Sequence, residues 1–213
     1  MNKPIRAISI VCMLLFLGLL LNSTYLQYVR AGELNSRDDN KRVRDAEYSR
    51  KRGSILVGDR AVAESVPVDD PYKYQRVYRQ PFKYAQLTGF YSYTYGRDGI
   101  ELTQNDILSG SDPRLFVNRV VDMIGNSQPK GGSVSLTIDP KAQTAAYDGL
   151  RALGKNTEGA VVALDPTTGK ILAMVSHPTY DPNRLASHKF SEVQKAWAEL
   201  NSAKSRLLLN RGI

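Results

Sequence analysis

The stretch from Gly159 to Asn183 constrains the fold most, because it holds two apolar runs around a short turn signal. Val161–Leu164 and Ile171–Val175 flank the segment Asp165–Gly169, which reads D-P-T-T-G. Proline sets φ for a turn, aspartate can hydrogen-bond the backbone ahead of it, and glycine can supply a positive φ. A β-hairpin is therefore predicted. Because neither arm alternates polar with apolar residues, both strands are expected to be buried on two faces, in the centre of a covered sheet.

An apolar run near the N-terminus predicts a membrane segment. Ala7–Val29 carries no charge, and at a rise of 1.5 Å per residue a helix of this length can cross a hydrocarbon core of about 30 Å. Tyr25 and Tyr28 stand where an interfacial aromatic belt would lie. A cleaved signal peptide is the alternative. No small-x-small cleavage site follows the run, so an uncleaved anchor is expected.

Composition limits which binding partners and which metal or disulfide sites the chain can have. The 213 residues suffice for one or two small domains, and the net charge of +8 favours anionic partners. Cys12 is the only cysteine, which excludes an intramolecular disulfide and a cysteine-based metal site. His177 and His188 lack ligand-like spacing and are predicted to be loop and surface residues.

The segment 31–60 is rich in charge and predicts a juxtamembrane stalk, helical in part from Glu33 to Arg50. Arg50–Arg52 could touch anionic head groups or form an ordinary solvated face, and the sequence leaves both open. Tyrosines alternate with lysines and arginines from Pro71 to Gly96. That pattern could bind single-stranded nucleic acid in a cytoplasmic protein, but the anchor argues against it. The alternation through Tyr91–Tyr95 predicts a strand whose rings pack against neighbours.

Capping signals place three further helices. Asp112 and Gly125 bound a helix predicted over Pro113–Ile124, and Ser191 with Gln194 predicts a capping box for a helix through Leu200. Between them, Gln128–Gly132 breaks the chain, and a one-sided strand with inward Val134, Leu136 and Ile138 follows. Asp139 is expected to cap a helix that begins at Pro140, ends at Gly154 and buries a stripe of Ala142, Ala145, Ala146, Leu150 and Leu153.

Four sequence segments together resemble the class B, monofunctional penicillin-binding proteins, in particular the penicillin-binding protein A group. The hairpin G-A-V-V-A-L-D-P-T-T-G-K-I-L-A-M-V-S with P-x-Y-D-P-N, and the upstream V-x-L-T-I-D-P-x-x-Q, are similar to the start of the transpeptidase domain. R-G-x-I from Arg52 to Ile55, followed by D-R at Asp59, resembles the opening of the pedestal domain, although the usual Asn-Gly turn is missing. The resemblance implies a strand that runs into a turn and back into a second strand here. G-x-x-G-x-E, which ends at Glu101, resembles the return of the pedestal. Glu101 is expected to be a structural hydrogen-bond partner.

The resemblance implies an α+β fold with a single N-terminal transmembrane helix, an extended pedestal and an incomplete transpeptidase domain. The expected boundaries are residues 1–30 for the anchor, 31–130 for the stalk and pedestal, and 131–213 for the start of the transpeptidase domain. It also implies a cytoplasmic N-terminus with the body outside, which the charges at Lys3 and Arg6 support only weakly because arginines and lysines follow on the other side.

The function implied is that of a peptidoglycan D,D-transpeptidase, which crosslinks stem peptides in cell wall synthesis and is acylated by β-lactams. The partners implied are the membrane, stem peptides, a polytopic glycosyltransferase, and division or elongation proteins. No nucleic acid and no cofactor are expected.

The chemistry of that family is missing from these residues. Penicillin-binding enzymes use S-x-x-K, S-x-N and K-[ST]-G. The one S-x-x-K is Ser127–Lys130, where Pro129 and two following glycines oppose the helix that the mechanism needs. Thr168–Lys170 has related letters in the wrong order, and Ser133, Ser176 and Ser191 have sufficient local roles. We therefore predict no catalytic, cofactor-binding or metal-binding residue in the chain.

Two hypotheses remain open at the level of sequence. Leu208–Arg211 resembles the L-x-N-R that precedes the nucleophile in the family, so the favoured hypothesis is an N-terminal part whose catalytic motifs lie beyond Ile213. The alternative is a complete, non-catalytic, membrane-anchored scaffold or binding module of the cell wall or division machinery.

Overall fold

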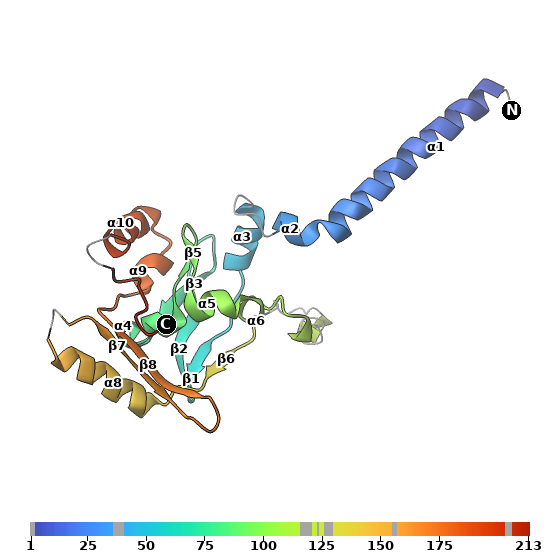
Figure 1. Ribbon diagram of the computed structural model, residues 1–213. Coiled ribbons are helices and arrows are strands. Elements are labelled where there is room, and N and C mark those ends of the chain that lie inside the picture. Colours follow the sequence, from blue (N-terminus) through green and yellow to red (C-terminus); the bar gives the residue numbers. More distant parts are fainter. Residues whose placement is uncertain are drawn as a thin grey trace. The chain divides into compact units, whose positions relative to one another are not determined.

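The computed structural model describes residues 3–35, 41–115, 121–122, 124–125, 130–154, 157–202 and 206–213, in two units, Met1–Asp45 and Ala46–Ile213 (Figure 1). The first unit holds α1 (Lys3–Thr24), a π-helical turn η1 (Tyr25–Val29) and α2 (Ala31–Asn35). No residue of α1 is buried, and Lys3–Val29 has a mean hydropathy of 2.3 and is long enough to cross a membrane. The predicted long apolar helix is confirmed.

The second unit is built around a four-stranded sheet of order β3-β2-β1-β6. Its strands are β1 (Ile55–Val57), β2 (Arg60–Pro67), β3 (Tyr74–Tyr78) and β6 (Val134–Leu136). β1 and β2 pair antiparallel across a turn in which Gly58 adopts a φ of 58°. The strand, turn and strand predicted after Arg52 are confirmed. β6 pairs parallel with β1, so the sheet joins residues on both sides of the predicted domain boundary.

The helix α3 (Lys41–Tyr48) precedes the sheet, and short helices and a small hairpin follow β3. The elements after β3 are α4 (Pro81–Thr88), β4 (Tyr91–Ser92), β5 (Gly96–Arg97), α5 (Gly99–Thr103), α6 (Asn105–Ser109) and the 3₁₀ turn η2 (Pro113–Leu115). The strand predicted through Tyr95 is wrong beyond Ser92. Residues 93–95 form a tight turn between β4 and β5, because Gly96 takes a φ of 73° and the Tyr95 N–H bonds the Ser92 hydroxyl.

The helix predicted over Pro113–Ile124 is observed only at its two ends. Asp112 caps η2 by accepting a hydrogen bond from the Arg114 N–H, and residues 121, 122 and 124 are helical. Residues 116–120 and 123 lie outside the described residues.

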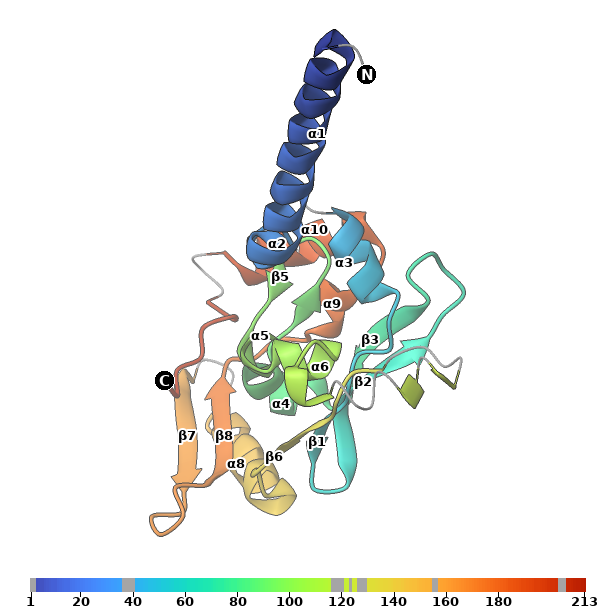
Figure 2. The same cartoon turned by 90° about the vertical axis from the view of Figure 1, so that its right-hand side faces the viewer.

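The C-terminal part holds α8 (Pro140–Ala152), the hairpin of β7 (Gly159–Leu164) and β8 (Ile171–His177), α9 (Asn183–Ala186) and α10 (Phe190–Leu200). α8 packs on the hairpin (Figure 2). The predicted cap is confirmed, because the Asp139 carboxylate accepts hydrogen bonds from the N–H groups of Lys141 and Ala142. The predicted stripe is partly wrong: Leu153 is 70% exposed, whereas Gln143 is completely buried.

The predicted hairpin is confirmed, but its expected burial on two faces holds for only one strand. Ala173, Met174 and Val175 of β8 are buried, while Val162 and Leu164 of β7 are 45% and 57% exposed. Among the described residues, β7 pairs with β8 alone.

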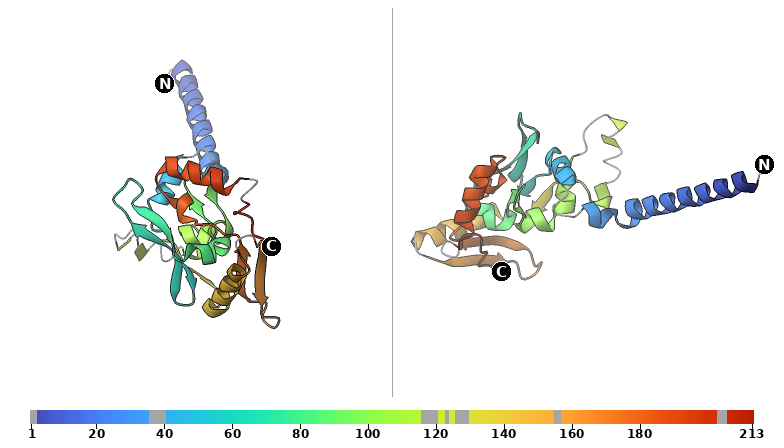
Figure 3. Two further views of the ribbon diagram at one scale, coloured as in Figure 1. Left: turned by 90° about the vertical axis from the view of Figure 1, so that its left-hand side faces the viewer. Right: turned by 90° about the horizontal axis from the view of Figure 1, so that it is seen from above.

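Two apolar clusters form the core of this unit. One centres on the sheet and includes Ile55, Val57, Tyr78 and Leu108. The other lies under α9 and α10, which pack against each other (Figure 3), and includes Phe90, Tyr180 and Leu185. The helix predicted through Leu200 is observed as α10, but the prediction of a capping box at Ser191 is wrong. α10 begins at Phe190, with Lys189 as its N-cap, and has no side-chain cap bond.

Candidate functional site

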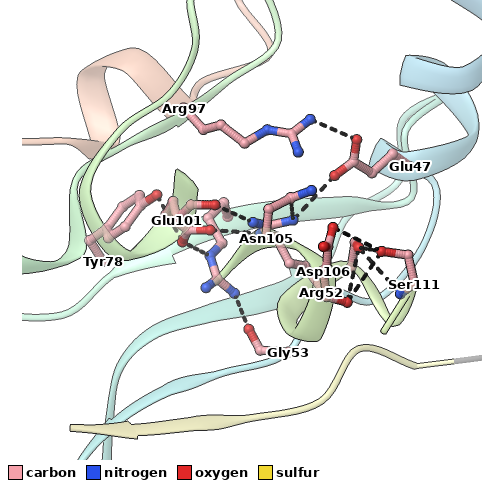
Figure 4. Close-up of polar contacts among 11 residues, drawn as sticks. Glu47, Arg52, Gly53, Tyr78, Arg97, Glu101, Asn105, Asp106 and Ser111 are labelled. Carbon is pink, nitrogen blue, oxygen red and sulfur yellow. Dashed lines mark hydrogen bonds and ion pairs between the residues drawn. The ribbon is translucent and has the colours of Figure 1, made fainter. Parts of the chain in front are cut away.

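The residues of the two pedestal motifs meet at one buried carboxylate. Arg52 stands before β1 and Glu101 lies in α5 (Figure 4). Arg76 of β3 completes the group. The Glu101 side chain has no exposed area, and those of Arg52 and Arg76 are 3% and 2% exposed. Motifs 49 positions apart therefore form a single charged cluster.

Each arginine binds one oxygen of Glu101. Arg52 Nε donates to Oε2 over 2.6 Å, and Arg76 Nε donates to Oε1 over 2.7 Å. One further nitrogen of each arginine reaches a backbone oxygen: Arg52 Nη2 donates to the Glu101 carbonyl, and Arg76 Nη1 donates to the Gly53 carbonyl. Charge-assisted bonds of this length are strong, and together they tie α5 to β3 and to the entry of β1.

A second layer of contacts surrounds the cluster. Arg52 Nη1 donates to Glu47 over 3.2 Å and to Asn105 over 3.0 Å. Glu47 also accepts from Arg97 over 2.9 Å (Figure 4). The Arg52 guanidinium lies 4.3 Å from the ring centroid of Tyr91, within cation–π range. Each arginine of the cluster thus forms an ion pair with Glu101 or Glu47.

The electrostatics keep Glu101 ionised. Burial alone would raise the pKa of Glu101, but the positive charges of Arg76 and Arg52 and their hydrogen bonds hold it below the ordinary value. Burial, followed by the negative charge of Glu101, raises the pKa of the Tyr78 hydroxyl far above its usual range. A carboxylate that accepts from two guanidinium groups and a phenol has no proton to give.

The cluster is therefore a structural joint and has no geometry for acid–base catalysis. Glu101 is enclosed, and its two oxygens are occupied by Arg52, Arg76 and Tyr78. The predicted role of Glu101 as a hydrogen-bond partner is confirmed. The sequence did not show which residues it would meet, because Arg76 comes from a tyrosine-rich stretch that matched no motif.

Glycines let the backbone pass closely beside this joint. The Gly53 N–H bonds the Leu108 carbonyl over 2.8 Å, and the Gly131 N–H bonds the Lys51 carbonyl over 2.9 Å. A Cβ at Gly131 would stand 1.8 Å from the Leu108 oxygen, and one at Gly53 would stand 1.8 Å from the Gly132 oxygen. Side chains cannot be accommodated at these contacts, so β6 reaches β1 only through glycine.

The serines considered at the sequence level lie apart from one another. Ser176, in β8, is buried, donates to the Leu209 carbonyl and accepts from the Arg211 N–H over 3.0 Å. Ser191 is exposed on the first turn of α10, and Ser133 precedes β6. Residues 126–129, which include Ser127, lie outside the described residues. Within the part of the chain described, neither Ser176 nor Ser191 hydrogen-bonds a lysine or histidine side chain.

The hairpin turn is organised by Asp165, as predicted. Its carboxylate accepts from the Thr167 N–H over 2.9 Å and from the hydroxyls of Thr167 and Thr168, and Gly169 takes a φ of 70°. The hydrogen bonds from Thr168 and Thr167 lower the pKa of Asp165 to about 2. Thr168–Lys170 is part of this exposed turn, and Thr168 donates to Asp165.

His188 lies in the loop between α9 and α10, as predicted. It is not a surface residue, because its side chain is only 11% exposed and its Nδ1 bonds Asp70 Oδ2. The loop position predicted for His177 is wrong, because His177 is the last residue of β8. Burial raises the pKa of Asp70, but the hydrogen bond with His188 and the hydrogen bonds from the backbone at Tyr72 and Lys73 together outweigh burial, so the net shift of that pKa is downward. The His188 ring centroid lies 4.8 Å from that of Tyr72, in an aromatic cluster that also includes Tyr48 and Phe190. The partners come from segments more than 100 positions apart, and no local pattern signals them.

No metal site is found in the ranges that the structure describes: they contain no group of three or more His, Cys, Asp or Glu placed to hold an ion.

Comparison with known proteins places the joint and the hairpin in a family. Residues 52–134 match the model described as "Penicillin binding protein A dimerisation domain", and residues 159–206 match "Penicillin binding protein transpeptidase domain".

Curated relatives match the chain from end to end. The proteins named "Peptidoglycan D,D-transpeptidase PbpA" from Mycolicibacterium smegmatis and Mycobacterium tuberculosis are each 44% identical over 100% of this chain. The chain spans 44% of the length of each of these relatives.

Solved structures give the same family. Penicillin-binding protein A from M. tuberculosis, as an acyl-enzyme complex, matches with a TM-score of 0.77 and 45% identity, over 79% of this chain and 38% of the other. Its penicillin G complex matches with a TM-score of 0.74 and 44% identity, over 77% of this chain and 38% of the other. The chain therefore belongs to the class B penicillin-binding proteins, the monofunctional type to which its penicillin-binding protein A relatives belong.

Proposed function

We propose that this chain is the anchor, pedestal and beginning of the transpeptidase domain of a peptidoglycan D,D-transpeptidase. The observation that carries the proposal is the end-to-end match, at 44% identity, to relatives that are named for this activity. In the proposed enzyme, a serine outside these residues attacks the D-Ala-D-Ala bond of a stem peptide, and an amine of a second strand then completes the crosslink. β-Lactams acylate the same serine.

The role of the described residues in that enzyme is support. The Glu101 joint fixes α5 against the sheet, and the Gly53 and Gly131 contacts join β6 to β1. We keep the division into residues 1–30, 31–130 and 131–213 as part of the proposal. No residue of the chain is assigned a catalytic, cofactor-binding or metal-binding role.

The proposed location is the cell membrane, with one crossing and the body outside. Lys3–Val29 is long and apolar enough to cross, and Lys3 and Arg6 favour a cytoplasmic N-terminus. A polytopic glycosyltransferase in the membrane is the proposed partner of the anchor and pedestal, and division or elongation proteins are proposed as further partners.

A chimera tests the proposal. The matching N-terminal part of the M. smegmatis relative would be replaced by this chain, and acylation by a fluorescent penicillin would be measured in membranes. If the chain is a transpeptidase support, the chimera should be acylated at a rate within a few-fold of the parent. A matched chimera that carries Glu101→Gln should lose most of its labelling, because its pedestal joint is broken. A correctly folded chimera that binds no penicillin would contradict the proposal.

A further inference from the structure

A basic pocket is lined by residues of β2, the start of α4 and α8. It has a volume of about 450 Å³, and its lining includes Arg60, Arg79, Gln80, Lys83 and Thr144. Three of these side chains carry positive charge, and no acidic residue lines the pocket. Neither the family resemblance nor the proposed transpeptidase reaction uses it.

The cations are held in different ways. Lys83 Nζ donates to the Thr144 hydroxyl over 3.0 Å, and that hydroxyl in turn donates to the Pro140 carbonyl over 2.7 Å. A neutral partner fixes the position of the ammonium group and leaves its charge uncompensated. Arg79 pairs with Glu64 through Nε and Nη2, at 2.9 and 2.8 Å, so its charge is balanced.

Arg60 supplies the second uncompensated charge. It begins β2 and is exposed, and no ion pair to it occurs among the residues the structure describes. Two acidic residues adjoin lining residues in the sequence, Asp59 before Arg60 and Asp139 before Pro140, and neither belongs to the lining. The Asp139 carboxylate accepts hydrogen bonds from the first N–H groups of α8. The pocket thus presents a net positive charge to solvent.

The backbone at the edge of the pocket is unusual at Gln80. Gln80 has φ 49° and ψ 52°, a left-handed conformation that a residue other than glycine rarely adopts. It is the N-cap of α4, yet its side chain makes no cap bond. Pro81 follows, so the first free N–H of the helix belongs to Phe82. The N-terminus of α4 carries a partial positive charge and has no side-chain cap bond, and its N-cap Gln80 lines the same pocket as Arg60 and Lys83.

We propose that this pocket binds a phosphate group, with Arg60 and Lys83 as its charged ligands and Gln80 as a neutral donor. A guanidinium, an ammonium and a helix N-terminus are the groups that proteins use for phosphate oxygens. Free phosphate and the phosphate of a lipid head group share this chemistry. The proposal is independent of the transpeptidase function, because none of these residues belongs to the Glu101 joint.

The test uses the full chain, labelled with ¹⁵N, in uncharged detergent micelles. Inorganic phosphate is titrated at constant ionic strength against chloride, and the shifts of the Phe82 and Lys83 amides are followed. We expect saturable binding, which Arg60→Gln weakens about tenfold or more because a charge-assisted bond is lost. Arg60→Lys should keep most of the affinity. Titration with dihexanoyl phosphatidate distinguishes the sources: tighter binding than phosphate indicates a lipid head group, and equal binding indicates free phosphate.

The matched control is Arg184→Gln, which removes one exposed arginine that pairs with Glu199 outside this pocket. The control should bind phosphate like the parent chain. Absence of saturation in the parent, or equal weakening by Arg60→Gln and Arg184→Gln, would overturn the proposal. Gln80→Gly should weaken binding several-fold, and an unchanged affinity would exclude Gln80 from the site. The amide spectrum itself reports whether each variant is folded.

Discussion

At the scale of single residues, Glu101 holds more of the pedestal together than any other described carboxylate. Glu101→Gln keeps the shape of the side chain and removes the charge that two buried arginines share. Loss of one partner from a buried ion pair costs about 3–5 kcal/mol, because the remaining charges stay buried without compensation. The free energy of unfolding, measured in urea by near-ultraviolet circular dichroism, should fall by that amount. Glu192→Gln, which breaks only an exposed pair with Lys189, should change it by about 0.5 kcal/mol or less.

The same group makes the stability depend on pH. The pKa of Glu101 in the folded chain lies below its ordinary value of 4.5, so its ionisation stabilises the folded state. This contribution is complete above the unfolded value and is lost as the pH falls through the lower, folded value. The difference in unfolding free energy between the parent and Glu101→Gln should therefore be constant near neutral pH and shrink in acid. Urea titrations from neutral pH to strongly acidic pH measure it, and a difference that grows in acid would contradict the assignment.

His188 and Gln143 show where residue-level prediction stopped. Gln143 looked like a polar position on a helix, yet its amide donates to the carbonyls of Lys83 and Met174 and accepts from the Met174 N–H. It satisfies backbone groups of a hairpin about 31 positions away. Helical periodicity places apolar residues on a face, but it does not reveal a buried amide whose partners come from another element.

At the scale of elements, glycine contacts decide how β6 meets β1. Gly131→Ala would place a Cβ 1.8 Å from the Leu108 oxygen, and we expect a loss of about 3 kcal/mol because backbone must move. Gly149→Ala is the matched control: it lies inside α8 with nothing within 4 Å of the added carbon, and it should stabilise the chain by about 0.5–1 kcal/mol. Thermal unfolding of the two variants should thus shift in opposite directions. Equal shifts would show that the close approach is not rigid.

Elements with local signals were predicted well, and elements fixed by distant partners were not. The cap at Asp139, the turn at Asp165 and the apolar helix from Lys3 are encoded within a few residues, and all three are observed. The strand through Tyr95 failed because Gly96 turns the chain after two residues, and the alternation of rings carries no information about strand length. The exposure of β7 depends on what else covers the sheet, which its own apolar residues do not encode.

At the scale of the whole molecule, the proposed topology is testable with a reporter. Alkaline phosphatase fused after Gly125 should be active, because residues after Arg30 are proposed to lie outside the membrane and the enzyme needs oxidising conditions to form its disulfides. A cytoplasmic reporter fused at the same position should be inactive. The opposite pair of results would place the body inside and remove the cell wall from its surroundings.

The central claim is that these residues anchor and support a D,D-transpeptidase and carry no nucleophile of their own. Acylation needs a serine whose oxygen is deprotonated by a nearby base and faces an oxyanion site. The most direct measurement is labelling by a fluorescent penicillin, applied to this chain and to the product of any longer reading frame that contains it. We predict no labelling of the 213-residue chain at concentrations that label intact class B enzymes, and labelling of the longer product at a serine beyond Ile213. Labelling of the 213-residue chain that is lost on Ser127→Ala would contradict the account.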